Sequence, residues 1–217
     1  MIGKQKGFIM TKRVVHVIGN GVMASLFDHS SKGLRLLCNL PPFNVDNAFA
    51  HCIVDFKMMK AMTEGSIQVP GRWILGFRPK KWMEANPQFN IQKSQQIREF
   101  YLELPEYANN YTDFNCGHFA VHYAANKLKA DEIHMYGFDS IFDPDLRSCT
   151  DFYLNSARDP AMNHKLNGNW RPIWYYMFKD FKDTKFILYH KHNELKVDHD
   201  DNVKVIVKDP RSMKKTG

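Results

Sequence analysis

The residues with the clearest chemical potential form a glycine-rich turn near the start of the chain. An apolar, β-branched run from residue 13 breaks at Gly19-Asn20-Gly21 and resumes at helical spacing up to residue 26. This order predicts a strand, a tight turn and the start of a helix. Such a turn lets the backbone approach a ligand closely and directs free N–H groups at an anion. The sequence therefore predicts a phosphate-binding site at this turn.

The same turn fits the dinucleotide-binding pattern Gly-x-Gly-x-x-Ala, with Ala24 in the last position. A nicotinamide cofactor also needs an acidic residue at the end of the next strand, where it binds the ribose hydroxyls. The next expected strand, 34–38, is followed by Asn39 instead, which disfavours an NAD-dependent dehydrogenase. Because an amide can donate to phosphate and accept from a hydroxyl, Asn20 and Asn39 fit another nucleotide. The alternative is that Asn20 only shapes a turn and Asn39 only ends a strand.

Composition limits the class of protein. A chain of 217 residues is long enough for one domain. Its four cysteines lack the paired spacing of metal sites, and no apolar run approaches the roughly 18 residues of a membrane span. We expect a single cytoplasmic domain over 1–217, with 1–10 as a loose extension. The net charge of +7 favours a polyanionic partner, either a nucleic acid or an anionic surface. The alternative is a solvated basic face together with a small substrate that carries phosphate.

Hydrophobic patterning predicts an α/β fold, a single Rossmann-like domain with a mostly parallel sheet. Short apolar runs predict strands at 13–18, 34–38, 50–54, 72–77, 132–139 and 185–189. Helical spacing predicts helices at 92–104, 115–128 and 170–181. Residues 140–168 lack a clear period and predict a lid-like loop, and 194–207 predict a C-terminal β-hairpin.

Four short motifs follow one another along this pattern: Gly19-Asn20-Gly21, Cys38-Asn39, Cys116-Gly117 and Gly137-Phe138-Asp139. In this order they resemble motifs of the bacterial sialyltransferases and of the related Rossmann-like family that includes archaeal 6-hydroxymethylpterin diphosphokinases. The resemblance covers roughly residues 13–142. The chain departs from the family in the extra residues 22–24 of the turn and in lacking the two tyrosines that face the phosphate.

The resemblance implies a role for each matching residue. Asn20 and Asn39, with the glycines beside Asn20, would bind the ribose and phosphate of a nucleotide sugar. The opposite side of the nucleotide would be lined by Asn115, Cys116 and Gly117, and Asp139 would complete the site. The family's general base is a histidine beyond the lid, for which His164 is our candidate and His118 the rival. Either Arg147 or Tyr153 would stand in for the missing tyrosines.

The implied activity is a metal-independent glycosyltransferase with a CMP- or UDP-type donor and no further cofactor. Its acceptor would be a glycan or a polyanion, including modified DNA. A second hypothesis is pyrophosphoryl transfer to a pterin-like alcohol, which needs Mg²⁺ and carboxylates such as Asp55 and Asp139. A third is a non-enzymatic module that binds nucleotides or nucleic acid.

Overall fold

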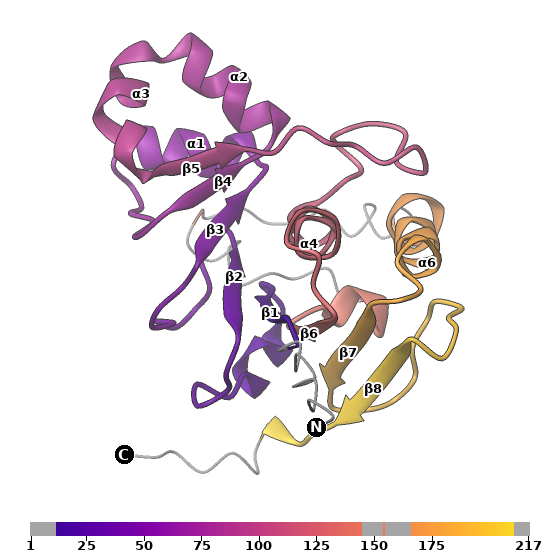
Figure 1. Ribbon diagram of the computed structural model, residues 1–217. Helices are drawn as coiled ribbons and strands as arrows, with labels where there is room; N and C mark the ends of the chain where they lie inside the picture. The colour runs from indigo at the N-terminus through magenta and orange to yellow at the C-terminus, as the bar shows by residue number, and fades with distance from the viewer. Residues whose placement is uncertain (1–11, 145–153, 155–165, 211–217) are drawn as a thin grey trace, which may run out of the picture.

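The computed structural model describes residues 12–144, 154 and 166–210. Eight strands form one sheet in the order β5-β4-β3-β2-β1-β6-β7-β8, and every neighbouring pair is parallel (Figure 1). The strands are β1 (Val14–Ile18), β2 (Leu34–Cys38), β3 (Ala50–Ile53), β4 (Trp73–Leu75), β5 (Ile97–Phe100), β6 (Glu132–Tyr136), β7 (Lys185–His190) and β8 (Val203–Val207). The predicted Rossmann-like α/β class is confirmed.

The strand order defines where a ligand site is expected. From β1 the chain adds β2 to β5 on one side, and then returns to add β6 to β8 on the other side. The order therefore reverses between β1 and β6. In open parallel sheets, ligands bind beyond the carboxyl ends of the strands at such a reversal.

Helices cover both faces of the sheet. One face carries α4 (Cys116–His122), its continuation η3 (Tyr123–Lys127) and α6 (Arg171–Asp180), and Figure 1 shows α4 and α6 side by side. The other face carries η1 (Val22–Leu26) over β1 and the helices α1 (Phe56–Thr63), α2 (Phe77–Ala85) and α3 (Pro87–Lys93) beside β3 to β5. The remaining short elements are η2 (Ser94–Gln96), η4 (Asp139–Ile141) and η6 (Leu166–Trp170). Among the described residues, no helix has the length and apolar character needed to cross a membrane.

Burial on both faces explains why the central strands are apolar runs. In β1, Val15 and Val17 pack into the cluster under α4 and α6, whereas Ile18 packs under η1. All three side chains are buried. Strands buried on both faces are apolar at successive positions, which makes them visible in the sequence.

The predicted helix at 92–104 is wrong. Residues 94–96 form a short turn of helix, and Ile97–Phe100 form β5 at the edge of the sheet. Along β5, half-buried and exposed residues alternate, with Ile97 packed beside Trp73 and Arg98 exposed. An edge strand with one face in solvent keeps only half of the apolar signal of a central strand.

The predicted C-terminal hairpin is also corrected. The first half of the segment, 194–199, forms no strand, and β8 pairs with β7 in parallel. Residues 191–202 run from the end of β7 back to the start of β8, and Leu195 and Val197 pack into the core under α6. A parallel pair needs such a crossover of about a dozen residues, whereas a hairpin would pair antiparallel strands.

Candidate functional site

The turn after β1 lies directly against the end of β6, at the reversal of the strand order. The main-chain N–H of Gly19 donates to the carbonyl of Tyr136 over 2.7 Å, and that of Gly21 donates to the carbonyl of Gly137 over 2.9 Å. A side chain at Gly19 would place its Cβ 2.6 Å from the Gly137 oxygen. The structure thus brings the first and last of the four motifs together.

This contact predicts a stability effect for Gly19→Ala. The neighbouring atom is main-chain oxygen and cannot rotate away, so the backbones of β1 and β6 must separate. We expect Gly19→Ala to lower the free energy of unfolding by about 1–3 kcal/mol, the usual cost of overpacking. Chemical denaturation measures the change. Gly168→Ala is the control, because a Cβ at Gly168 meets nothing within 4 Å. Equal stability of both variants would contradict the close packing at Gly19.

Asp139 occupies the place predicted for a phosphate. Both carboxylate oxygens accept from the main-chain N–H of Met23 at 3.3 Å, at the start of η1. A Cβ on Gly21 would lie 2.6 Å from the carboxylate carbon. Burial raises the pKa of Asp139. In this conformation the N–H groups of Gly19 and Gly21 donate to carbonyls and that of Met23 donates to an internal carboxylate, so the predicted phosphate position over Gly19–Gly21 is already filled.

Two amide side chains at this edge keep buried oxygen atoms without a partner. The Oδ1 atoms of Asn20 and Asn39 accept no hydrogen bond within the part of the chain that the structure describes. Asn39 is 5% exposed and adopts the left-handed φ of 52°. Its backbone is held on both sides, since its N–H donates to Cys52 and its carbonyl accepts from His51 Nδ1 at 2.7 Å. Unpartnered buried oxygens are uncommon and are suited to a ligand's hydroxyl groups.

At the start of α4, the predicted site residues Asn115, Cys116 and Gly117 make contacts that stabilise the fold. The Asn115 oxygen caps the helix by accepting from the main-chain N–H of His118 at 3.1 Å. The Cys116 thiol donates to the Cys52 carbonyl at 2.9 Å, and burial raises its pKa, so it stays protonated. A Cβ on Gly117 would lie 2.9 Å from the Phe138 ring. These contacts join β3, α4 and the end of β6 around the amides.

His118, the rival base, is fully buried between α4 and the segment before α6. Its Nδ1 accepts from the main-chain N–H of Asn115 at 3.3 Å, and its Nε2 donates to the Trp170 carbonyl at 3.1 Å. Burial lowers its pKa to about 3. Both ring nitrogens are therefore occupied, and His118 is not available as a base. The other candidates for chemistry, His164, Arg147 and Tyr153, lie outside the described residues.

The carboxylates named for Mg²⁺ have other partners. Asp55 accepts from Arg78 Nη2 at 2.7 Å, and the Asp139 carboxylate accepts from the main-chain N–H of Met23 at the start of η1. The cluster of described residues that could hold a metal ion consists of Asp143, His190 and His192, and it includes neither of them. Among the described residues, Asp55 and Asp139 are therefore not grouped as ligands of one ion.

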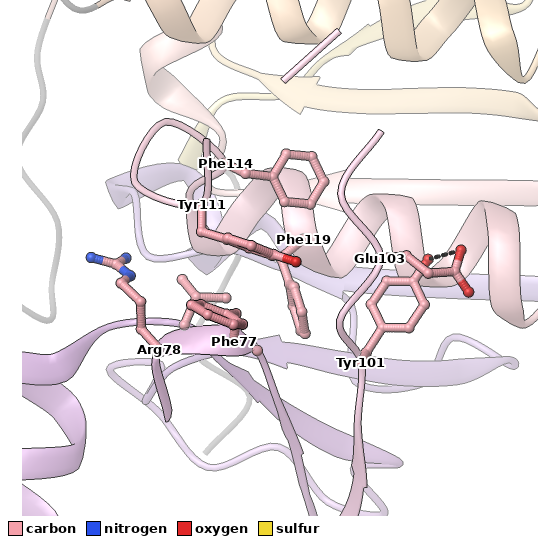
Figure 2. Close-up of a pocket in the computed structure, with 9 residues that line it drawn as sticks. Phe77, Arg78, Tyr101, Glu103, Tyr111, Phe114 and Phe119 are labelled. Atoms are coloured by element: carbon pink, nitrogen blue, oxygen red, sulfur yellow. Dashed lines mark hydrogen bonds between the residues drawn. The ribbon is translucent and has the colours of Figure 1, made fainter. Parts of the chain in front are cut away.

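A small pocket beyond the ends of β3 to β5 was not predicted. It is narrow and partly open to solvent. Phe77 and Tyr111 stack with ring centroids 4.5 Å apart, and Tyr101 donates to Glu103 beside them (Figure 2). Its other lining residues are Val54, Gly76, Arg78, Phe114 and Phe119. The aromatic residues at 101–114 were a sequence signal for a pocket, but their convergence depends on the path of the loop over the sheet.

No protein family matches the chain, and no curated protein or solved structure is significantly similar to it. The fold and the site define a Rossmann-like α/β protein with amide side chains at the reversal of its strand order. The likeness to sialyltransferases rests on the four motifs alone.

Proposed function

We propose that the protein is a metal-independent glycosyltransferase that uses a CMP- or UDP-type sugar donor. The observation that carries this proposal is the pair of unpartnered amide oxygens of Asn20 and Asn39, at the carboxyl ends of the neighbouring strands β1 and β2. Ribose hydroxyls can donate to such oxygens. The motif resemblance supports the reaction type, and the place of the two amides at the ends of neighbouring strands supports the position of the site.

The charge of Asp139 sets the orientation of the donor in this proposal. A buried carboxylate at the turn repels a phosphate there, so the ribose lies over Asn20 and Asn39 and the phosphate points away from η1. Arg147 then neutralises the leaving phosphate. The acceptor hydroxyl attacks the anomeric carbon, His164 takes its proton, and the nucleotide departs with the electrons of the broken bond. Positioning, charge stabilisation and one base account for the chemistry.

The acceptor in this proposal is a glycan or a polyanion, including a base of modified DNA. The net charge of +7 supports a negatively charged acceptor. Titration with a DNA duplex at rising salt distinguishes a DNA acceptor from a glycan acceptor. Binding to a DNA acceptor should fall steeply with salt, because each neutralised phosphate releases counterions.

Nucleotide binding tests the amides directly. In a thermal-shift panel of CMP, UDP, GDP, ATP and NAD, we expect CMP or UDP to raise the melting temperature and NAD to leave it unchanged. Asn39→Ala should weaken pyrimidine nucleotide binding by about 1–3 kcal/mol, the scale for losing a buried hydrogen bond. Titration calorimetry measures the affinity.

Asn47→Ala is the matched control for this change. Asn47 has almost the same φ as Asn39, 54° against 52°, so the backbone cost of alanine is alike, but Asn47 is exposed. Its variant should bind nucleotide as the wild type does. Stabilisation by NAD alone would overturn the proposal. Unchanged affinity in both Asn20→Ala and Asn39→Ala would reduce the two amides to structural roles.

A further inference from the structure

Three potential metal ligands converge beyond the carboxyl end of β7. Asp143 follows η4, His190 is the last residue of β7, and His192 lies two residues further on. One ligand atom from each side chain lies within 4.8 Å of the other two. This cluster is separate from the amides of Asn20 and Asn39 and takes no part in the function proposed above.

The spacing of the ligand atoms fits a single ion. His192 Nε2 lies 2.9 Å from one oxygen of Asp143, and His190 Nε2 lies 3.7 Å from the other. In a tetrahedral zinc site with bonds of about 2.0–2.2 Å, neighbouring ligand atoms are about 3.4 Å apart. The two distances run to different oxygens of Asp143 and bracket this value, and all three ligand atoms lie within 4.8 Å of one another, so side-chain rotations can bring them to the spacing that an ion requires.

His190 gives the strongest indication of a ligand. It is 1% exposed, and its Nε2 atom has no hydrogen-bond partner among the described residues. A buried polar atom without a partner carries a free-energy cost that an ion or another ligand would remove. The orphaned atom faces Asp143, inside the cluster.

The cluster is held in place by its neighbours. The His190 ring lies parallel to the Phe142 ring with centroids 4.0 Å apart. The main-chain N–H of Asp143 donates to the Asp139 carbonyl at 2.8 Å, and Arg171 donates to the Asp143 carbonyl at 3.3 Å. Rigid supports of this kind lower the cost of assembling a metal site.

Binding of an ion requires two local changes. Main-chain N–H groups of His192 and Glu194 donate to Nδ1 of His190 and of His192 at 3.4 Å and 3.2 Å, which places the ring protons on Nε2. Binding moves these protons to Nδ1 and gives up two long hydrogen bonds, which a metal–imidazole bond outweighs. Lys191, 3.5 Å from Asp143, is 53% exposed and can turn into solvent.

From this geometry we infer that Asp143, His190 and His192 bind one divalent transition-metal ion. Two imidazoles and one carboxylate suit Zn²⁺ and its spectroscopic substitute Co²⁺, and leave room for water or another ligand. The bound ion joins the segment after β6 to the end of β7. Its role is to fix these two chain segments together, independently of sugar transfer.

The test uses the full chain without an affinity tag, stripped with EDTA and dialysed into metal-free buffer. Co²⁺ is titrated in while its visible absorption is recorded, and Zn²⁺ is then added to displace it. We expect one equivalent of Co²⁺ to bind with the absorption of a nitrogen–oxygen site, and Zn²⁺ to displace it. Zn²⁺ should also raise the melting temperature.

Two variants and one control identify the site. His192→Ala and Asp143→Asn each remove a partly exposed ligand, so the fold should survive, and circular dichroism verifies it. Each should weaken Co²⁺ binding by roughly 100-fold or more, the loss that follows from removing a metal ligand or its support. His199→Ala alters an exposed histidine outside the cluster and should bind as the wild type does. Absence of Co²⁺ binding by the wild type, or equal binding by all three variants, overturns the inference.

Discussion

Lowering the pH from about 7.5 to about 5.5 is expected to remove about 3 kcal/mol from the free energy of unfolding. Burial lowers the pKa of His118 to about 3 and that of His122 to about 4. In the unfolded chain both rings titrate near the ordinary value of 6.5. At pH 5.5 the two histidines are therefore protonated in the unfolded state and neutral in the folded state. This difference lowers the free energy of unfolding by about 1.4 kcal/mol for each histidine.

The sign of this effect follows from the lowered pKa values. The stability is fully present above pH 6.5 and is lost progressively as the pH falls toward the folded values. Burial also lowers the pKa of His16 and of His51, which adds to the loss. The raised pKa of Asp139 opposes it as a single group. Urea unfolding at the two pH values measures the difference.

Single substitutions assign the protons. His122→Gln removes one buried titrating ring, so its stability should depend less steeply on pH than that of the wild type, by up to one proton. His29→Gln, which alters an exposed ring, is the control for replacing an imidazole by an amide. If the wild type has the same free energy of unfolding at both pH values, the buried histidines are protonated in the folded protein.

His164→Ala should reduce turnover by about 10²–10⁴, the usual contribution of a general base, and leave donor affinity nearly unchanged. The reason is that in the proposed sugar transfer the base acts on the acceptor hydroxyl in the transition state and is not needed for nucleotide binding. Initial rates at saturating donor measure turnover, and calorimetry with the nucleotide measures affinity.

Asn163→Ala is the control, because it alters the neighbouring residue without removing an imidazole. It should retain turnover. Wild-type turnover in His164→Ala would show that another group takes the proton, and the occupied nitrogens of His118 make that residue an unsuitable replacement. A parallel loss of turnover and donor affinity would indicate instead that His164 binds the donor.

The central strands could be predicted because burial on both faces leaves a plain apolar run. The predicted range of β2, 34–38, matches the observed strand, and β3 and β7 each differ from prediction by one residue at one end. β5 was missed, because only one of its faces is partly buried. The direction of β8 depends on the crossover 191–202, whose path is set by Leu195 and Val197 packing on distant residues.

The placement of the two amides could be predicted because it depends on the topology alone. Asn20 and Asn39 follow neighbouring parallel strands, and the carboxyl ends of such strands share one edge. The hydrogen bonds of Asp139 and Cys116 involve Met23 and Cys52, respectively, which are remote in sequence. Position along the chain carries no signal for such contacts.

The cluster at the end of β7 left one local signal. His190 and His192 are two residues apart at the end of an apolar strand, a spacing that resembles a pair of ligands. Their third partner, Asp143, belongs to a segment that reads as loop in the sequence. Only the fold, which places β6 beside β7, brings the carboxylate to the two rings.

The central place of β1 has a consequence for how the chain is made. On the ribosome, β2 to β5 can pair outward from one edge of β1 as they emerge, but the opposite edge must wait for β6. Residues 19–131 are synthesised in that interval, with an apolar strand edge exposed to wrong partners. Pairing with β6 thus covers the open edge of β1, and a nascent chain stalled before residue 132 should be a substrate for chaperones.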